Sequence, residues 1–283
     1  MKPAPFDYES PATLDEALAL LDRPGACPLA GGQSLIPSLS TRRMRPDLLV
    51  DLRRIPNLRG IDADAHSLRI GPLVTFAEAA ASSELRSACP LVVEAIRHVG
   101  SPAIRNRGTL AGNLVWADPA SELPLVAVAL RAVLTLRHRD GVREVEAADF
   151  FLGAFETAIR PGEIVISIRI PKGATGARAG FAEVSLRRNA PALAAVAVQI
   201  EAADGRVRAA RIAAGSLQPT PMRLASVEAA LEAAEPGTDL PALGALAAGQ
   251  TIAGLAGQST AGYAGTVLAA LVGRAIASTL AAL

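Results

Sequence analysis

The sequence is short of cysteine and of net charge. Only Cys27 and Cys89 are cysteines among 283 residues. Two thiols are too few for the four ligands of an iron–sulfur cluster or a four-cysteine zinc site, and they provide no disulfide framework. Lys and Arg total 28 against 27 Asp and Glu, a net charge of +1, whereas proteins that neutralise nucleic-acid phosphates carry a basic excess. We therefore expect no nucleic-acid partner and a reducing, cytoplasmic location.

The chain also has little that would place it in a membrane. The N-terminal MKPAPFDYESP lacks the apolar core of a signal peptide. The C-terminal 264–283, AGTVLAALVGRAIASTLAAL, is long enough to span a bilayer, but Arg274 lies in its middle and its apolar content is mostly alanine. This pattern predicts a packed terminal helix and no membrane span.

The common catalytic and nucleotide motifs are missing. Neither glycine-containing loop described below is a GxGxxG dinucleotide fingerprint, and no GxxxxGK[ST] phosphate loop or GxSxG elbow occurs. His66, His98 and His138 are scattered without the spacing of metal ligands, so we interpret them as surface or capping histidines. The sequence predicts no catalytic residue and no metal site on this chain.

What is present is a mixture of short strands and helices with a helical C-terminal part. Thr13 and Glu16 form a capping box that begins a helix. Asp140-Gly141 and Asp204-Gly205 separate alternating apolar runs and predict hairpins closed by primed turns. The order lacks regular strand–helix alternation, which predicts an α+β fold. Expected strands cover 27–29, 48–52, 68–70, 133–137, 142–145, 163–171, 193–201 and 207–213; expected helices cover 13–21, 75–85, 90–99, 123–130, 223–234, 240–248 and 261–283.

A first candidate binding segment is Ala30–Leu35, AGGQSL, which follows a short strand. Gly31 and Gly32 let backbone amides approach an anion and adopt positive φ. Ser34 adds a hydroxyl donor beside a possible helix start. The alternative interpretation is an ordinary turn from a strand to a helix.

A second candidate is residues 104–122, IRNRGTLAGNLVWADPASE. Its density of turn-forming residues predicts a non-repetitive loop, and Thr109 and Asn113 are donors at a spacing that can bracket a diphosphate. Asp118 and Glu122 are acceptors suited to sugar or polyol hydroxyls. The alternative is a surface loop followed by a capped helix. Together the two segments favour a nucleotide-sized ligand with a diphosphate at its centre.

These segments resemble the FAD-binding medium subunit of the molybdenum hydroxylases, the family of xanthine dehydrogenase and aerobic carbon monoxide dehydrogenase. The resemblance rests on AGGQSLIPSLSTR, IGPLVTFAEAA and CPLVVEAIRHVGSPAIRNRGTLAGNLVWADPASELP, followed in the family's order by EIVISIRIP, FAEVSLRR and GSLQPTPMRLASVEAAL. It implies a vanillyl-alcohol-oxidase-type FAD-binding domain at 1–175, with subdomains at about 1–57 and 58–175. A small α+β C-terminal domain of sheet plus helices, resembling that of carbon monoxide dehydrogenase flavoproteins, follows at 176–283. The boundary falls in the linker candidate 172–179, KGATGARA.

The resemblance also implies which residues bind FAD. Val165 packs on the isoalloxazine, Glu122 takes the place of a usual Asp that bonds flavin hydroxyls, and Glu183 takes the place of a frequent Lys beside the ring. Asp118, an acceptor suited to sugar or polyol hydroxyls, is also counted among the residues expected to bind the cofactor. The residues implied for the diphosphate are Ala30, Gly31, Gly32, Gln33, Ser34, Leu35, Thr109, Leu110, Ala111, Gly112 and Asn113.

The sequence departs from the family's pattern at five places. Ala111 replaces a usual Gly, Trp116 replaces a smaller residue or His, and Glu122 is one methylene longer than Asp. These three bear on the fine geometry of FAD binding. Asn189-Ala190 replaces Gly-Asp, and Tyr263-Ala264 replaces Tyr-Arg, which bears on partner contacts or on access to the flavin.

The function that the resemblance implies is electron transfer within a molybdenum-containing hydroxylase complex. Electrons pass from [2Fe-2S] clusters on a small iron–sulfur subunit to FAD on this chain and leave to NAD+, a quinone or oxygen. A large subunit carries the molybdenum cofactor, and the family's assembly is a dimer of heterotrimers. Two alternatives are a standalone flavin oxidase, with His98 the nearest residue for a covalent FAD link, and a scaffold subunit that has lost the flavin.

Overall fold

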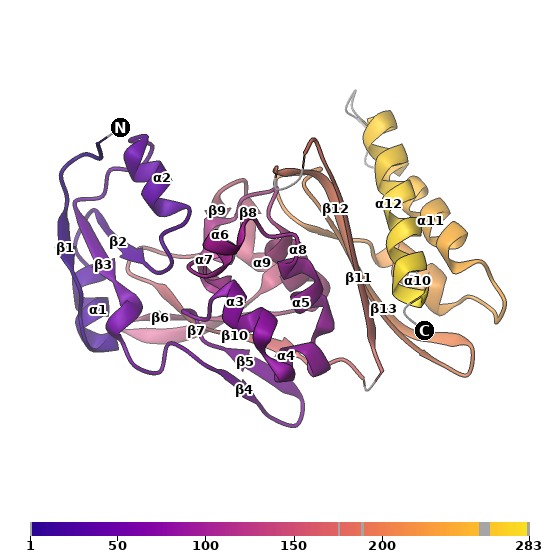
Figure 1. Cartoon of the computed structure of the whole chain (residues 1–283), viewed down its shortest axis with the longest axis horizontal. Helices are drawn as coiled ribbons and strands as arrows, with labels where there is room; N and C mark the ends of the chain where they lie inside the picture. Colours follow the sequence, from indigo (N-terminus) through magenta and orange to yellow (C-terminus); the bar gives the residue numbers. More distant parts are fainter. Residues whose placement is uncertain (1, 175, 188–189, 255–260, 282–283) are drawn as a thin grey trace.

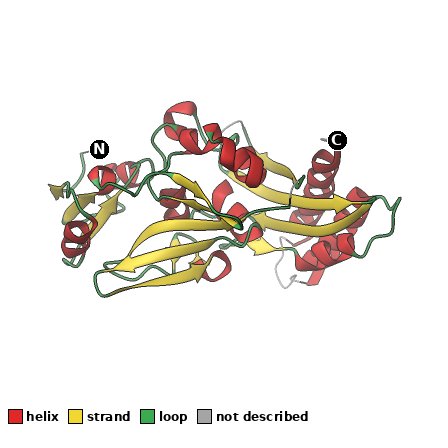
Figure 2. Cartoon of the chain, turned by 90° about the horizontal axis from the view of Figure 1, so that it is seen from below, coloured by secondary structure: helices red, strands yellow, loops and turns green. Residues whose placement is uncertain are grey.

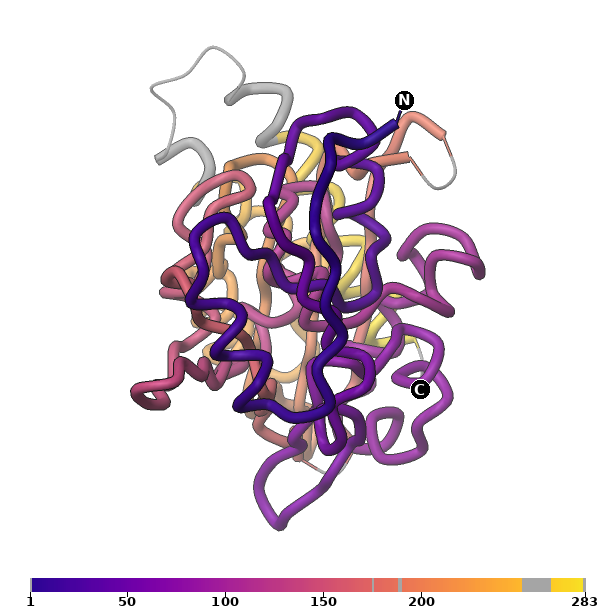
Figure 3. Tube along the Cα trace, turned by 90° about the vertical axis from the view of Figure 1, so that its left-hand side faces the viewer, coloured from indigo at the N-terminus to yellow at the C-terminus, as the bar shows by residue number. Residues whose placement is uncertain are grey.

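The computed structural model describes residues 2–174, 176–187, 190–254 and 261–281. The three larger sheets follow one another along the long axis, with the N-terminal unit at one end and the C-terminal helices at the other (Figure 1). Figure 3 looks along this axis, with the N-terminal unit toward the viewer. The mixture of helix and sheet confirms the predicted α+β class.

The N-terminal unit is a small parallel sheet in the order β1-β3-β2. The Thr13 side chain accepts from Glu16 N and the Glu16 carboxylate accepts from Thr13 N, so the predicted capping box begins the first helix. Leu18, Leu48 and Val50 form the core between helix and sheet. The elements are β1 Asp7–Glu9, α1 Leu14–Leu21, β2 Ala26–Leu29, α2 Leu35–Ser40, β3 Leu48–Asp51 and the 3-10 helix η1 Leu52–Arg54.

The middle unit is an antiparallel sheet in the order β4-β5-β10-β6-β7, with helices packed on it. Its central strand is the alternating segment EIVISIRIP. The strands are β4 Ile61–Ala63, β5 Ser67–Ile70, β6 Val133–His138, β7 Gly141–Glu146 and β10 Ile164–Pro171, beside the small pair β8 Phe151–Gly153 and β9 Glu156–Thr157. The helices are α3 Phe76–Ala81, α4 Ser83–Ala88, α5 Pro90–Ile96, α6 Pro102–Arg105, α7 Leu110–Trp116, α8 Glu122–Ala129 and α9 Ala147–Phe150.

The C-terminal unit is an antiparallel sheet in the order β11-β12-β13-β14 with helices on both sides (Figure 2). Neighbouring residues of β12 belong to opposite cores: Ala195 and Ala197 pack with the core of the middle unit, whereas Val196 and Val198 pack with the C-terminal helices. The elements are β11 Arg178–Ser185, β12 Ala192–Ala203, β13 Arg206–Gly215, β14 Met222–Arg223, α10 Ala225–Glu232, α11 Leu240–Gly254 and α12 Ala261–Ala281.

The terminal helix α12 packs on the C-terminal sheet as predicted. Leu268, Leu271, Val272 and Ile276 are buried in its contact with the sheet and α11. Across the described ranges, no helix has both the length and the apolar character needed to cross a bilayer.

Three local predictions were wrong. The helix expected over 75–85 ends at Ala81, and a new one begins at Ser83 because the Ser82 hydroxyl caps Leu85 N. Residues 104–122, expected as a non-repetitive loop, contain the end of α6, the whole of α7 and the first residue of α8. The β6–β7 turn is Arg139-Asp140, one residue earlier than predicted and without the positive φ of a primed turn. Asp204-Gly205 is confirmed, with φ of 53° and 72°.

Candidate functional site

A cavity of about 700 Å³ lies beside the glycine-containing segments, between the N-terminal and middle units. This is within the usual range of ligand pockets. Most of the predicted site residues meet at this cavity, although they come from three distant parts of the chain. They are Ala30, Gly31, Gly32, Gln33, Ser34, Leu35, Thr109, Ala111, Gly112, Asn113 and Val165.

The first wall is the turn between β2 and α2. Gly32 has φ +74°, a conformation that L side chains rarely adopt. Gly31 lies against the next wall: a Cβ at this position would be 2.2 Å from Arg107 O. At the start of α2, Ile36 N donates to Gly32 O at 3.0 Å and Ser38 N donates to Ser34 O at 3.3 Å. The helix start is thus bonded to the turn before it, and the turn residues themselves line the cavity. Glycine thus occurs where the two walls meet, at Gly31, and where the backbone of the turn lines the cavity, at Gly32.

The second wall is the first turn of α7. Thr109 is the N-cap, and its Oγ1 accepts from Gly112 N at 3.0 Å. Backbone bonds join this turn to the start of α3: Phe76 N donates to Gly108 O and Leu110 N donates to Val74 O, each at 3.0 Å. The turn is thus a helix start rather than the predicted loop. Capping uses the Thr109 hydroxyl as an acceptor and leaves its O–H as a donor.

Asn113 carries an open acceptor at the cavity. Its Nδ2 donates to Ser121 Oγ at 3.1 Å, but its Oδ1 is buried without a hydrogen-bond partner among the described residues. A buried carbonyl oxygen without a partner is unfavourable unless a ligand or water donates to it. Asn113 therefore marks a point where a ligand with a hydroxyl or N–H donor fits.

Four of the predicted site residues do not line this cavity in the described chain. Leu110 is 2% exposed and packs in the core of the middle unit. Asp118 Oδ1 accepts from Ala120 N at 2.9 Å and stabilises the turn before α8. Glu122 and Glu183 lie in a separate polar cluster, which also includes a residue that was not predicted as a site residue.

That residue is His98, which follows α5. Its Nδ1 lies 3.4 Å from Glu183 Oε1, and its ring packs on Phe181 with centroids 4.8 Å apart. The hydrogen bond that the imidazole donates to the Glu183 carboxylate raises the pKa of His98. Burial raises the pKa of Glu122 to about 7, and the nearby negative charge of Glu183 adds to the shift. The interpretation of His98 as a surface or capping residue was wrong, because its ring packs on Phe181 and pairs with Glu183. No local pattern in the sequence indicated this, since no motif connects His98 to Glu122 or Glu183, which lie 24 and 85 positions later.

Glu163, the residue before β10, forms part of the cavity wall and is ion-paired with Arg143. Its carboxylate accepts from Arg143 Nε at 2.7 Å and from Arg160 N at 2.8 Å. It is 9% exposed. The hydrogen bonds from Arg143 lower the pKa of Glu163.

This ion pair predicts a pH-dependent stability. A carboxyl whose pKa is lower in the folded than in the unfolded chain stabilises the fold above its unfolded pKa, about 4.3, and loses that contribution as pH falls through the folded pKa. We expect Glu163→Gln to cost about 2 kcal/mol at pH 7 and progressively less below pH 4.3. Urea unfolding at pH 7, 5 and 4 measures this difference. Exposed Glu144→Gln, in a pair with Arg169, is the control and should cost at most about 0.5 kcal/mol. If Glu163→Gln lowered the free energy of unfolding by the same amount at all three pH values, the lowered pKa of Glu163 in the folded chain would be contradicted.

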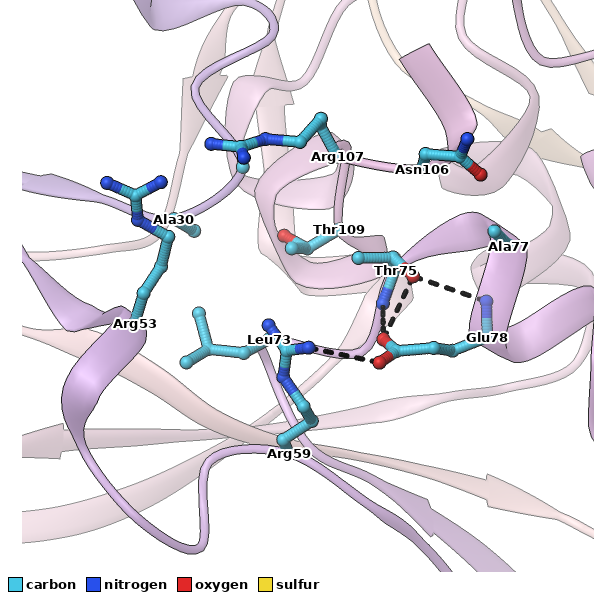
Figure 4. A pocket seen from close by; sticks show the side chains of 11 residues that line it. Ala30, Arg53, Arg59, Leu73, Thr75, Ala77, Glu78, Asn106, Arg107 and Thr109 are labelled. Atoms are coloured by element: carbon cyan, nitrogen blue, oxygen red, sulfur yellow. Dashed lines mark hydrogen bonds and ion pairs between the residues drawn. The ribbon is translucent and has the colours of Figure 1, made fainter. Parts of the chain in front are cut away.

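A second, smaller pocket of about 370 Å³ shares Ala30, Gly31, Leu73 and Thr109 with the lining of the larger cavity. Figure 4 shows Arg53, Arg59 and Arg107 around it. Arg53 pairs with Asp51, and Arg59 Nη1 donates to Glu78 Oε1 at 3.0 Å. Because two of the three guanidinium groups are already paired with carboxylates, the larger cavity is the better candidate for a nucleotide-sized ligand.

Comparison with known families gives two matches that together cover most of the chain. Residues 4–173 match the FAD binding domain in molybdopterin dehydrogenase. Residues 179–279 match the CO dehydrogenase flavoprotein C-terminal domain.

Individual proteins are similar over most of their length. The beta subunit of caffeine dehydrogenase from Pseudomonas sp. (strain CBB1) is 38% identical over 86% of this chain and 83% of its own. The medium chain of carbon monoxide dehydrogenase from Afipia carboxidovorans is 38% identical over 78% of each chain. Carbon monoxide dehydrogenase from Hydrogenophaga pseudoflava, solved without the Mo-pyranopterin moiety, has a chain of 32% identity that superposes with a TM-score of 0.91 over 99% of both chains.

Proposed function

This chain belongs to the family of FAD-binding medium subunits of molybdenum hydroxylases, and on that premise we propose that it carries electrons within such a complex. It is an oxidoreductase subunit with an FAD-binding domain. In the proposal, electrons come from [2Fe-2S] clusters on a partner chain and leave to an external acceptor: NAD+, a quinone or oxygen.

Two features of the cavity fit FAD. Gly31 and Gly32 keep side-chain atoms away from the point where the N-terminal unit meets the α7 turn, so a diphosphate can approach backbone amides there. The buried Asn113 Oδ1 has no partner among the described residues and accepts a hydrogen bond from a ligand hydroxyl or N–H. This cavity, with its open acceptor, is the observation that carries the proposal.

The proposed roles follow the position of each residue. Ala30–Leu35 and the first turn of α7, Thr109–Asn113, hold the diphosphate. Leu110 is part of that turn, with its side chain in the core and its N–H bonded to Val74 O. Asn113 Oδ1 accepts from a hydroxyl or N–H of the ligand rather than from phosphate. Val165, at the cavity and 4% exposed, packs on the isoalloxazine. Asp118, Glu122 and Glu183 lie beyond the cavity lining and act on the flavin end as neighbouring charges and acceptors. FAD supplies the chemistry, because a flavin exchanges electrons singly or in pairs.

The proposal includes partners and organisation. A small iron–sulfur subunit and a large molybdenum-cofactor subunit complete the complex as a dimer of heterotrimers in the cytoplasm. In the proposal the chain has two domains, at 1–175 and 176–283. The first holds FAD, and the sheet of the second packs on α5 and α8 of the first. Relatives described as a medium chain and a beta subunit support a multi-chain assembly.

A visible absorption spectrum of the purified full chain tests the proposal, taken before and after heat release of its cofactor. A released FAD spectrum is expected. Colourless protein that also takes up no added FAD would favour the scaffold alternative and overturn the proposal. Colour that stays with the denatured chain would favour a covalent flavin oxidase.

The role of Asn113 gives a sharper prediction. We expect Asn113→Ala to weaken FAD binding about tenfold, because a lost hydrogen bond of about 1.5 kcal/mol is worth that factor. Flavin fluorescence during titration of the apoprotein with FAD measures the Kd. The control is Asn106→Ala, on the preceding turn but at the smaller pocket, which should leave the Kd unchanged. Weaker binding by the Asn106 variant alone would instead place FAD in the smaller pocket.

A further inference from the structure

Trp116 and Phe155, here called the aromatic corner, lie in a part of the cavity lining to which no role has been given above. Trp116 is the last residue of α7, Phe155 lies in the turn between β8 and β9, and both line the cavity. Their ring centroids are 6.0 Å apart and their planes meet at 74°, an edge-to-face arrangement. Phe155 is 59% exposed and Trp116 is partly exposed, so the rest of the described chain leaves part of the corner uncovered.

The backbone holds the aromatic corner in a conformation that is unfavourable for its residues. Phe155 has φ of 59° and Ala117, next to Trp116, has φ of 48°, whereas bulky residues rarely adopt positive φ. The two positions are bonded to each other, since Phe155 N donates to Ala117 O at 2.8 Å. Burial does not explain a phenylalanine at this position, because more than half of it is exposed. Strained residues of this kind gather at ligand sites.

We propose that the aromatic corner binds the isoalloxazine ring of FAD, with the indole of Trp116 in contact with that ring. The inference rests on the proposed function, since it requires FAD in the cavity, and it adds two ring-binding side chains to Val165. The resemblance to the family does not supply them, because Trp116 stands where the family's pattern has a smaller residue or His. Two rings at a steep angle can hold a planar ligand by stacking on one and by edge contact with the other.

The order of residues along α7 matches the order of groups in the flavin half of FAD. The first turn of the helix, from Thr109 to Gly112, lies beside the glycines proposed to hold the diphosphate. Asn113 follows with its open acceptor for a hydroxyl, and Trp116 lies close to one turn further. At a rise of about 1.5 Å per residue, Trp116 is about 6 Å beyond Gly112 along the helix axis. Diphosphate, ribityl hydroxyls and ring succeed one another in the same order.

The apolar lining beside the corner favours the flavin half of FAD over the adenosine half, which also runs from diphosphate through hydroxyls to a ring. Val115, Ile159 and Val165 come from the same unit as the corner, line the cavity, and belong to or pack against the core of the middle unit. The isoalloxazine ring is larger than adenine and has an apolar dimethyl edge. It therefore buries more apolar area on this lining than adenine does.

The flavin emission of FAD bound to the full-length chain tests the contact directly, because Trp116 is the single tryptophan of the sequence. An indole in contact with a flavin quenches the flavin's emission by electron transfer, and this quenching is lost when the two rings are apart. We expect FAD on the unaltered chain to be dark and FAD on Trp116→Phe to be bright, with a similar Kd because phenylalanine keeps an aromatic face. Equal flavin emission from the two proteins would overturn the inference.

Two further variants separate ring binding from a merely structural role. Trp116→Ala and Phe155→Gly each remove one ring, and each should raise the Kd for FAD about three- to tenfold in calorimetric titration of the apoprotein. Glycine at 155 also adopts positive φ without strain, so the Tm of ligand-free Phe155→Gly should equal or exceed that of the unaltered chain. Leu152→Ala is the matched control: Leu152 is also 59% exposed, on the adjoining strand β8, but does not line the cavity. Its Kd should be unchanged.

Titration with ADP distinguishes the two ends of FAD. Trp116→Ala should leave the Kd for ADP unchanged, whereas equal weakening of ADP and FAD binding would place adenine at the aromatic corner and contradict the inference. Unchanged FAD binding in both Trp116→Ala and Phe155→Gly would also overturn it and leave the proposed function intact. No binding of FAD by the unaltered chain would overturn the proposed function itself.

Discussion

Gly31→Ala should purify with little or no FAD. The added Cβ would lie 2.2 Å from Arg107 O and 3.0 Å from Gly108 Cα, and backbone atoms cannot rotate away as a flexible side chain can. The N-terminal turn must therefore move off the α7 turn, which changes the space between the two walls. Overpacking of this kind costs about 1–3 kcal/mol, and we expect FAD binding to weaken roughly 10- to 100-fold.

The ratio of flavin to protein absorbance in the purified variant and the Kd of its apoprotein measure this effect. Gly141→Ala is the matched control. It also replaces a glycine by alanine, but no atom lies within 4 Å of the added Cβ. Full FAD content in Gly31→Ala would mean that the contact between the two turns does not define the cofactor site.

Glu228→Ala should cost about 3–5 kcal/mol of unfolding free energy, the largest stability loss predicted here. Glu228, in α10, is 5% exposed and accepts from Ile212 N at 2.7 Å and from the Arg223 guanidinium. Truncation leaves the amide of a buried strand and a half-buried cation without an acceptor. Both groups then carry their full desolvation cost.

Urea unfolding of the full chain measures this loss. Glu235→Ala is the control in the same unit: its pair with Arg206 has side chains 46% and 74% exposed, and exposed pairs contribute at most about 1 kcal/mol. Equal costs for the two variants would show that burial does not decide the strength of these pairs.

The sequence was sufficient for the elements whose signals are local. The Thr13–Glu16 capping box, the Asp204-Gly205 turn and the strand predicted at 163–171 each depend on a few adjacent residues, and each is confirmed. The strict alternation predicted for that strand is not, because the burial of its residues does not alternate and its pairing with β6 shifts between Val165 and Ser167. The splitting of the helix at Ser82 was missed because a hydroxyl can either continue or cap a helix, and the apolar spacing on both sides is the same.

The candidate site was predictable only in part. The glycines at Ala30–Leu35 and at Gly112 indicate close backbone approach, and the cavity lies there. The density of glycine and asparagine around Thr109 was misleading, because these residues sit in the first turns of a helix rather than in a loop.

His98 was beyond prediction because its partners come from distant segments. Its contact with Glu183 depends on how β11 packs against α5, which no local pattern encodes. Of the departures from the family's pattern, Asn189 and the side chains of Tyr263 and Ala264 lie outside the described residues.

The alternation along β12 limits how the chain can change its length. A deletion or insertion of one residue within a strand exchanges its two faces. Here it would turn Val196 and Val198 toward α5 and α8, which pack against alanines, and would leave alanines facing α12. Changes of length in homologous chains should therefore gather at the Asp204-Gly205 turn, where the glycine has open space around it, while β12 keeps a constant number of residues.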